Sequence, residues 1–290
     1  MKTLGILVIG IVIISACFYQ HSTEASDAQT DYETGFRYYE SKDYAEALKW
    51  VHKAADQGNA EAQCCLGVMY YDGEGVPRNY GEALKWFRKS ADQGNAHAQV
   101  FLGNMYRFGK GVTQNNVEAV RWYHKSANQG SPAAQVLLGD MYRFGKGVTQ
   151  DYSEALKWFR KSADQGGAPA QRFLGSLYSL GQGVPNDYGE AVKWYLKAAD
   201  QGDAEAQVLL GDMYYSGQGV TQNYEEALKW LSKAADQGDV LAQQAIGWMY
   251  FEGKGVSKNL IEAKNWFRKA ASQGDEEALK MLKQLTEMGF

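Results

Sequence analysis

The chain has 290 residues, of which 45% are hydrophobic and 22% are charged, and its formal net charge is −4. This composition is sufficient for a packed core. A mildly acidic chain without a basic block does not favour nucleic-acid binding, which requires clustered Lys and Arg against phosphate groups. Lys and Glu are dispersed along the whole sequence, which is typical of an ordinary solvated surface.

The N-terminal residues have the pattern of an export signal. One basic residue, Lys2, precedes an apolar run from Leu4 to Ile14, and the small residues Ser15 and Ala16 follow. The run is shorter than the roughly 20 residues that a transmembrane helix needs, so a permanent membrane span is not favoured. We predict a signal peptide over residues 1–16 and an exported protein.

The end of this segment resembles a bacterial lipoprotein signal. Ile14-Ser15-Ala16-Cys17 is similar to the lipobox, in which the cysteine is lipidated and becomes the mature N-terminus. We therefore predict lipid attachment at Cys17 and a polar tether over residues 17–30, with the protein facing the periplasm or the cell surface. The alternatives are cleavage near Ala25, which gives a soluble periplasmic or secreted protein, and an uncleaved anchor.

Seven tryptophans recur at a constant spacing of 36 residues through the remainder of the chain. A fixed period of this length is typical of a solenoid of stacked units, which bury a continuous core and present one long surface. We therefore assign residues 31–290 to a single repeat array. The tryptophans in this register are Trp50, Trp86, Trp122, Trp158, Trp194, Trp230 and Trp266.

The first half of each unit predicts a helix. In the unit of residues 59–94, Ala62, Cys65, Leu66 and Met69 have the i, i+3, i+4, i+7 spacing of one buried helix face. A favoured N-cap residue precedes this helix in successive units, and a glycine follows it as a left-handed C-cap. The predicted N-caps are Asn59, Asn95, Ser131, Gly167, Asp203, Asp239 and Asp275.

The second half of each unit predicts another helix. Asn79 is its N-cap, and Glu82 has the spacing of a capping box, in which the Glu side chain bonds the N–H of the cap residue. Gly67 lies inside the first helix at a cost of roughly 1 kcal/mol relative to Ala, so its recurrence predicts close approach of a neighbouring helix. The fold class is therefore all-α: an α/α solenoid of about seven helix-turn-helix repeats, closed by a capping helix over residues 276–288.

The recurring residues resemble those of the Sel-like repeat family, which is related to the tetratricopeptide repeats. The similarity rests on Ala60-Glu-Ala-Gln-x-x-Leu-Gly-x-Met-Tyr70, on Gly-x-Gly-Val in the connection, and on Glu82-Ala-Leu-Lys-Trp-Phe-x-Lys-x-Ala-Asp-Gln-Gly94, and it covers residues 31–290. The resemblance implies an adaptor in protein–protein interaction. For an exported bacterial member of the family, the resemblance implies a role in envelope assembly, in host contact or in the regulation of peptidoglycan enzymes. One branch of the family has a cysteine pair in each repeat, and this chain lacks those pairs.

Positions that vary between repeats indicate where a partner binds. In the unit of residues 59–94 these are positions 64, 68 and 71, which share one face of the first helix opposite the core face. The resemblance implies that the first helices line an inner, concave surface, so we expect a protein or peptide partner there. The alternatives are a solvated stripe and packing of Trp248, which is outside the tryptophan register, against the next repeat. The predicted partner-binding residues are Asn104, Arg107, Asp140, Arg143, Asp212, Tyr215, Trp248 and Phe251.

A hydrolase acting on envelope material is the competing hypothesis. The sequence has no nucleophile elbow, no zinc-ligand pair on one helix turn and no phosphate-binding loop that follows a strand. Cys64 and Cys65 are adjacent, so a disulfide between them would be strained, and both are expected to be reduced structural residues. We predict a non-catalytic scaffold with no cofactor, no metal and no nucleic acid, which meets the membrane only through its lipid anchor. A structural spacer or a regulator of a peptidoglycan-acting enzyme is the alternative.

Overall fold

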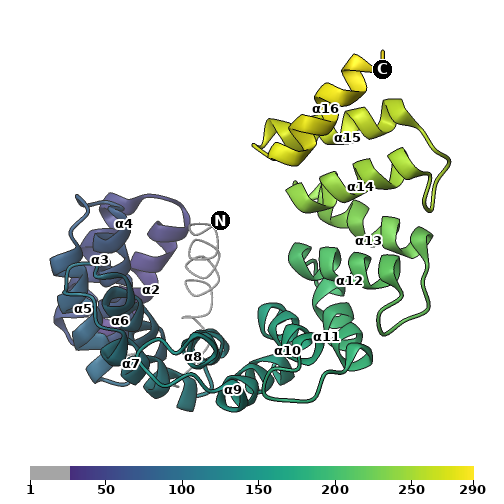
Figure 1. Ribbon diagram of the computed structural model, residues 1–290. Coiled ribbons are helices and arrows are strands. Elements are labelled where there is room, and N and C mark those ends of the chain that lie inside the picture. The colour runs from purple at the N-terminus through teal and green to yellow at the C-terminus, as the bar shows by residue number, and fades with distance from the viewer. Residues whose placement is uncertain (1–26) are drawn as a thin grey trace. The chain divides into compact units, whose positions relative to one another are not determined.

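The structure of the protein is a computed structural model that describes residues 27–290, and these residues form fifteen helices (Figure 1). The predicted signal peptide, Cys17 and most of the predicted tether lie outside the described residues. Among residues 27–290, no helix has both the length and the apolar character needed to cross a bilayer. The helices are α2 (Asp27–Glu40), α3 (Tyr44–Asp56), α4 (Ala60–Asp72), α5 (Tyr80–Asp92), α6 (Ala96–Phe108), α7 (Asn116–Asn128), α8 (Pro132–Phe144), α9 (Tyr152–Asp164), α10 (Ala168–Leu180), α11 (Tyr188–Asp200), α12 (Ala204–Ser216), α13 (Tyr224–Asp236), α14 (Val240–Glu252), α15 (Leu260–Ser272) and α16 (Glu276–Glu287).

The prediction of an all-α solenoid is confirmed. Helices pack in consecutive pairs, such as α4 with α5 and α6 with α7, and successive pairs within a unit contact each other, as α5 does with α6 and α11 with α12. The chain divides within α9 into two compact units, one of described residues up to Trp158 and one from Phe159 to Phe290. The first helix, α2, begins at Asp27, so the last four residues of the predicted tether are already helical.

The predicted caps of the first helices form as expected. Asn59 Oδ1 accepts the N–H of Ala62 at 2.8 Å, and the same bond starts the first helix of most repeats. Gly167 takes the cap position of α10 without a side-chain bond. At the other end, Gly73 has a φ of 80° and its N–H donates to the carbonyl of Met69, which closes the helix in the left-handed conformation that glycine adopts readily.

The second helices are capped differently from the prediction. Asn79 Oδ1 accepts the N–H groups of Gly81 and Glu82, at 3.0 and 3.1 Å, but the Glu82 side chain is bonded to Lys85 at 2.6 Å. The reciprocal bond of the capping box is therefore absent here, because the N–H of Asn79 already donates to the carbonyl of Tyr70 at 2.8 Å. That bond ties the connection to the end of the first helix, and the Glu forms an exposed i, i+3 ion pair instead.

The glycines inside the first helices lie under a large side chain of the paired helix. A Cβ at Gly103 would lie 2.5 Å from the ring of Tyr123, and a Cβ at Gly67 would lie 2.6 Å from the ring of Phe87. Both rings are fully buried. The prediction of close helix approach is confirmed, since only a residue without a side chain leaves room for the ring at these positions.

The tryptophans of the register join successive repeats. Trp122, on α7, is 8% exposed and packs in one cluster with Phe87 of the preceding repeat and with Leu102 and Met105 of its own. Lys125 Nζ lies 3.8 Å from the centre of its ring and covers the outer face. Trp50 and Trp266, in the first and last repeats, are only partly buried. The core is therefore continuous across repeat boundaries within each unit.

The C-terminal helix α16 closes the array with one apolar face. Ala278, Met281 and Leu285 are buried against α15, where they pack with Phe267. The remaining positions of the helix are mostly exposed Lys and Glu. This arrangement matches the predicted polar lid over the final repeat.

Candidate functional site

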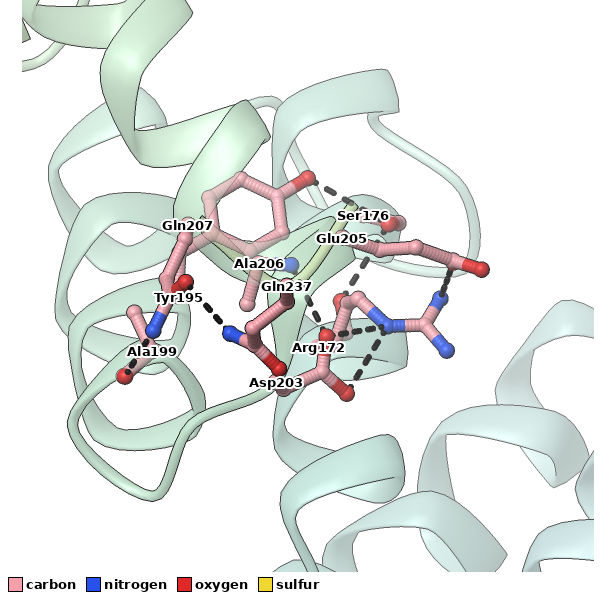
Figure 2. Close-up of polar contacts among 9 residues, drawn as sticks. All are labelled: Arg172, Ser176, Tyr195, Ala199, Asp203, Glu205, Ala206, Gln207 and Gln237. Atoms are coloured by element: carbon pink, nitrogen blue, oxygen red, sulfur yellow. Dashed lines mark hydrogen bonds and ion pairs between the residues drawn. The ribbon is translucent and has the colours of Figure 1, made fainter. Parts of the chain in front are cut away.

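Glutamines at constant positions of the repeats form a series of buried hydrogen bonds. These side chains are part of the framework and not of a surface for a partner. Gln207 is 3% exposed, and its Nε2 donates to the carbonyl of Ala199 at 3.0 Å (Figure 2). Its Oε1 accepts from Gln237 Nε2 at 2.9 Å. Equivalent Gln–Gln bonds of 2.7–3.0 Å join the two halves of four other repeats, with donors and acceptors Gln93 and Gln63, Gln129 and Gln99, Gln201 and Gln171, Gln273 and Gln243.

The N-terminal end of this series has a carboxylate in place of the buried glutamine. Asp31 is 5% exposed and accepts from Gln57 Nε2 at 2.7 Å and from Lys53 Nζ at 2.9 Å. The hydrogen bond from Lys53 holds the pKa of Asp31 below its ordinary value. The charge of this buried carboxylate is thus compensated by Lys53.

Replacing Gln207 with leucine is expected to lower the free energy of unfolding by about 2 kcal/mol, because two hydrogen bonds are lost. The Ala199 carbonyl loses its side-chain donor and keeps the N–H of Gly202, and the amide of Gln237 loses its acceptor. Leucine has a similar volume, so the lost bonds dominate the effect. Urea unfolding followed by circular dichroism measures it. The matched control is Gln222→Leu, since Gln222 is exposed and its bond to the Tyr215 carbonyl is open to water. Equal losses for the two variants would show that this series of buried bonds contributes nothing specific.

In the N-terminal unit, two of the predicted partner-binding residues form a small polar cluster. Asn104 and Arg107 are both partly exposed on α6. Tyr123 Oη donates to Asn104 Oδ1 at 2.7 Å, and Arg107 also interacts with this hydroxyl. Burial raises the pKa of Tyr123, so its phenol stays neutral and able to donate. The side chains of Asn104 and Arg107 are therefore held in place by the framework before any partner binds.

The equivalent residues of the next repeat, Asp140 and Arg143, are also partly exposed on α8. The guanidinium carbon of Arg143 lies 4.9 Å from the ring centre of Phe144, as that of Arg107 lies 5.1 Å from the ring centre of Phe108. Both arginines therefore lie beside an aromatic ring at the C-terminal end of a first helix.

In the C-terminal unit, Tyr215 is part of a charged cluster between two repeats. Its hydroxyl donates to Glu252 Oε2 at 3.1 Å and accepts from Lys254 Nζ at 2.8 Å, and its ring is edge-on to Tyr224. The hydrogen bond with Lys254 lowers the pKa of Glu252, and that with Glu252 raises the pKa of Lys254. Asp212 is exposed nearby on α12, and desolvation by its neighbours raises its pKa.

Trp248 and Phe251 on α14 form an aromatic group with the second helix of their own repeat. The ring centre of Trp248 lies 5.5 Å from those of Phe251 and Phe267, in edge-to-face geometry. Lys258 Nζ lies 5.6 Å from the Phe251 ring centre. Both aromatic side chains are partly exposed. One part of each packs against its own repeat, and the other part is accessible at the surface.

The prediction of one surface stripe is wrong at its first position in several repeats, and also at its second position in the unit of residues 59–94, where Val68 is 4% exposed. Cys64 is 2% exposed, Val100 is fully buried and Val208 is 9% exposed. These side chains pack into the core clusters shared with the following repeat, which a single helix face does not reveal. Cys65, which we assigned to the core, is only partly buried. The predicted binding residues are thus the second and third stripe positions, distributed over both units.

The same first position carries Arg172 in the C-terminal unit, a residue that the sequence reasoning missed. Its Nε lies 3.0 Å from Asp203 Oδ1 and its Nη1 lies 2.6 Å from Glu205 Oε2 (Figure 2). Asp203 is also the N-cap of α12, so Arg172 links α10 to the start of the next repeat. The signal in the sequence was a charged residue at a position that is Cys or Val in the three preceding repeats and Val in the next one.

Within residues 27–290, no group of three or more His, Cys, Asp or Glu side chains is placed to hold a metal ion. The polar clusters described above instead consist of hydrogen bonds and ion pairs that connect repeats. What the arrangement offers chemically is a set of side chains for non-covalent recognition.

Comparison with known proteins places these features in a family. The Sel1 repeat family model matches residues 32–59, 60–95, 96–131, 132–167, 168–203, 204–239 and 240–275. No functionally curated protein matches the chain.

Solved structures show the same fold. The structure of c5321, a protective antigen of uropathogenic Escherichia coli with an SLR fold, is 38% identical with a TM-score of 0.83, and the match covers 91% of this chain. The chain spans only 57% of that protein. A Sel1 repeat protein from Oxalobacter formigenes is 36% identical with a TM-score of 0.78, and the match covers 83% of this chain and 99% of that one. The immunity protein PA5088 from Pseudomonas aeruginosa, 19% identical with a TM-score of 0.51 over 75% of this chain and 88% of that one, shares the fold alone.

Proposed function

The chain belongs to the Sel1 repeat family, whose members are generally protein–protein interaction scaffolds, and on that premise we propose that it is a non-catalytic scaffold for a partner protein or peptide. The partner binds along the first helices, at Asn104, Arg107, Asp140 and Arg143 in one unit. In the other unit it binds at Asp212, Tyr215, Trp248 and Phe251.

One observation carries this proposal. Residues at the constant positions of the repeats stabilise the fold. The tryptophans pack in the core, the glutamines bond buried carbonyls, and the Asn and Asp residues cap helices. The proposed partner-binding residues lie at positions that vary between repeats, and their Asn, Arg, Asp, Tyr, Trp and Phe side chains are partly or fully exposed. Residues of these types anchor many interfaces, and a scaffold needs them to differ between repeats while the framework stays the same.

We further propose that the scaffold works at the bacterial cell envelope. The support comes from the sequence, where residues 1–16 have the pattern of a signal peptide and Cys17 is placed for lipid attachment. The similarity to a protective antigen of uropathogenic E. coli agrees with export. The lipid would be the only membrane contact, with the tether separating the array from the bilayer.

Cys17→Ser is expected to abolish labelling of the protein with radioactive palmitate and to shift it from the membrane fraction to the soluble fraction. The reason is that the cysteine sulfur is the predicted site of lipid attachment. Cells that express the wild-type chain provide the reference. A wild-type chain that takes up no label would leave cleavage near Ala25 or an uncleaved anchor as the explanation of the N-terminal segment.

Site-specific photo-crosslinking in cells tests the scaffold itself. A photoreactive amino acid at position 140, 212 or 248 is expected to give the same crosslinked protein from several positions, identified by mass spectrometry. Position 157 is the control, because Lys157 is exposed on a second helix and paired only with Glu154 of its own helix turn. Adducts no stronger at positions 140, 212 and 248 than at position 157 would favour a structural spacer.

A further inference from the structure

Two successive repeats of the N-terminal unit carry an identical segment at the end of the first helix. Residues 105–114 and residues 141–150 both read Met-Tyr-Arg-Phe-Gly-Lys-Gly-Val-Thr-Gln. Each copy carries two positive charges and no acidic residue. Together they place six side chains, three in each copy, at matching register positions of neighbouring repeats. We call these the Arg-Phe surface: Arg107, Phe108, Lys110, Arg143, Phe144 and Lys146.

The two phenylalanines of the Arg-Phe surface are exposed apolar side chains surrounded by cations. Phe108 is 43% exposed and Phe144 is 54% exposed. Arg107 lies beside the Phe108 ring, and Phe144 has two cations near it, because Lys146 Nζ is 5.5 Å from its ring centre in addition to Arg143. Arginine stacked on a ring loses little freedom when it then bonds a carboxylate, since its position is already fixed.

The fold does not require a phenylalanine at this position. The last residue of the first helix is Asp72, Leu180, Ser216 or Glu252 in other repeats, and each is followed by the same left-handed glycine cap. Neither Phe108 nor Phe144 belongs to a buried core cluster. Exposure of two aromatic rings in adjacent repeats is therefore a feature of the surface and not of the framework.

The lysines of the two copies differ in their hydrogen bonds to the preceding repeat. Lys110 Nζ donates to Tyr80 Oη at 3.1 Å, so this cation is partly held by the preceding repeat. The residue equivalent to Tyr80 in the next repeat is Asn116, and Lys146 is exposed beside Phe144 instead. The end of the surface around Phe144 is consequently the more available one for a ligand.

We propose that the Arg-Phe surface binds an acidic peptide segment that also carries aromatic or aliphatic side chains. Its carboxylates pair with Arg107, Arg143 and Lys146, and its apolar side chains cover Phe108 and Phe144. Alternating acidic and apolar residues match alternating cations and rings, which a uniform polyanion does not. A polyphosphate would leave the exposed rings of Phe108 and Phe144 uncovered, whereas the apolar side chains of such a peptide bury them. The proposal rests on the scaffold function and specifies the chemistry of the partner for one part of it.

Selection of peptides on the full-length chain tests this inference. The probe is a displayed library of random peptides about ten residues long, which in extended conformation can span two neighbouring repeats. Selected peptides are then measured by fluorescence anisotropy against the wild type and against the variant Phe108→Ser/Phe144→Ser. Leu180→Ser is the matched control, because Leu180 has the same register position and is 60% exposed but has no such pair of cations. Melting temperatures of both variants establish that they are folded.

The expected result is enrichment of peptides with Asp or Glu beside Phe, Trp or Leu, and binding that is weakened about tenfold or more by the double substitution but not by Leu180→Ser. Enriched peptides without this composition, or peptides that bind the double variant equally well, would overturn the inference. So would single-stranded DNA or anionic phosphatidylglycerol vesicles binding with the same dependence on the two phenylalanines. If crosslinking at positions 140, 212 and 248 succeeds and is unchanged in the double variant, this inference fails while the scaffold function stands.

Discussion

Replacing Trp122 with alanine is expected to lower the free energy of unfolding by about 3–5 kcal/mol. The indole is 8% exposed and lies between Phe87 of the preceding repeat and Leu102 and Met105 of its own. Truncation leaves a cavity at the boundary between two repeats. Contacts at this boundary couple the repeats, so that the array unfolds as one. Urea unfolding measured by circular dichroism and by tryptophan fluorescence gives the loss in stability.

The variant Trp50→Ala is the matched control for this prediction. Trp50 occupies the same register position in the first repeat but is only partly buried. Its loss is expected to be clearly smaller than that of Trp122. In the Trp122 variant, the two probes should also show separate transitions, since the repeats on either side lose their coupling. A loss at Trp122 no greater than at Trp50 would contradict the assignment of the tryptophans to the boundaries.

Replacing Gly111 with alanine is expected to cost about 3 kcal/mol or more, for two reasons. Gly111 has a φ of 67°, a conformation that costs an L-residue roughly 1–2 kcal/mol. A Cβ there would also lie 2.5 Å from the backbone carbonyl oxygen of Tyr80, at the start of α5 in the preceding repeat. Backbone atoms cannot move aside as a flexible side chain can, so the loop must separate from that repeat. The melting temperature and the urea midpoint report the effect.

Gly94→Ala separates the two contributions to the Gly111 prediction. Gly94 also has a positive φ, of 95°, but nothing lies within 4 Å of the Cβ that alanine would add. Only the conformational cost applies there, so its loss should be about 1–2 kcal/mol. Equal losses at both glycines would mean that contact between the loop and Tyr80 is unimportant.

Much of the framework could be predicted from the sequence because its causes are local or strictly periodic. The spacing of the tryptophans gave the repeat length, Asn59 and its equivalents marked helix starts, and the glycine at position 67 indicated close packing. The capping box at Glu82 was wrong because the N–H of Asn79 is bonded by the carbonyl of Tyr70. That carbonyl belongs to another helix, and no local pattern reveals where it lies.

The candidate surface was less predictable because its exposure depends on contacts between repeats. Val100 looked like a stripe residue, yet the following repeat buries it completely. Gln207 reads as an ordinary polar residue of the motif, and its burial and its bond to Ala199 follow only from the packed helices. Conversely, Phe108 and Phe144 look like core residues by type, and the structure places both at the surface. The register was therefore misleading for Val100, and side-chain type was misleading for Gln207, Phe108 and Phe144.

The structure thus assigns the constant positions to stability and leaves some of the varying positions accessible, among them Arg107 and Arg143. Gln207, Trp122 and Gly111 act on neighbouring repeats and are expected to change unfolding. Arg107 and Arg143 lie on the surface beside exposed rings and contribute little to the core. A scaffold can change its partner through the second set without losing its fold.

The most direct test of this division is photo-crosslinking from position 140 in cells that carry the variant Arg107→Ala/Arg143→Ala. The predicted result is loss of the adduct formed by the otherwise unsubstituted chain, with the helical circular dichroism signal and the melting temperature near those of the wild type. An unchanged adduct in the folded variant would contradict the account, because it would show that a partner binds without the side chains assigned to its recognition.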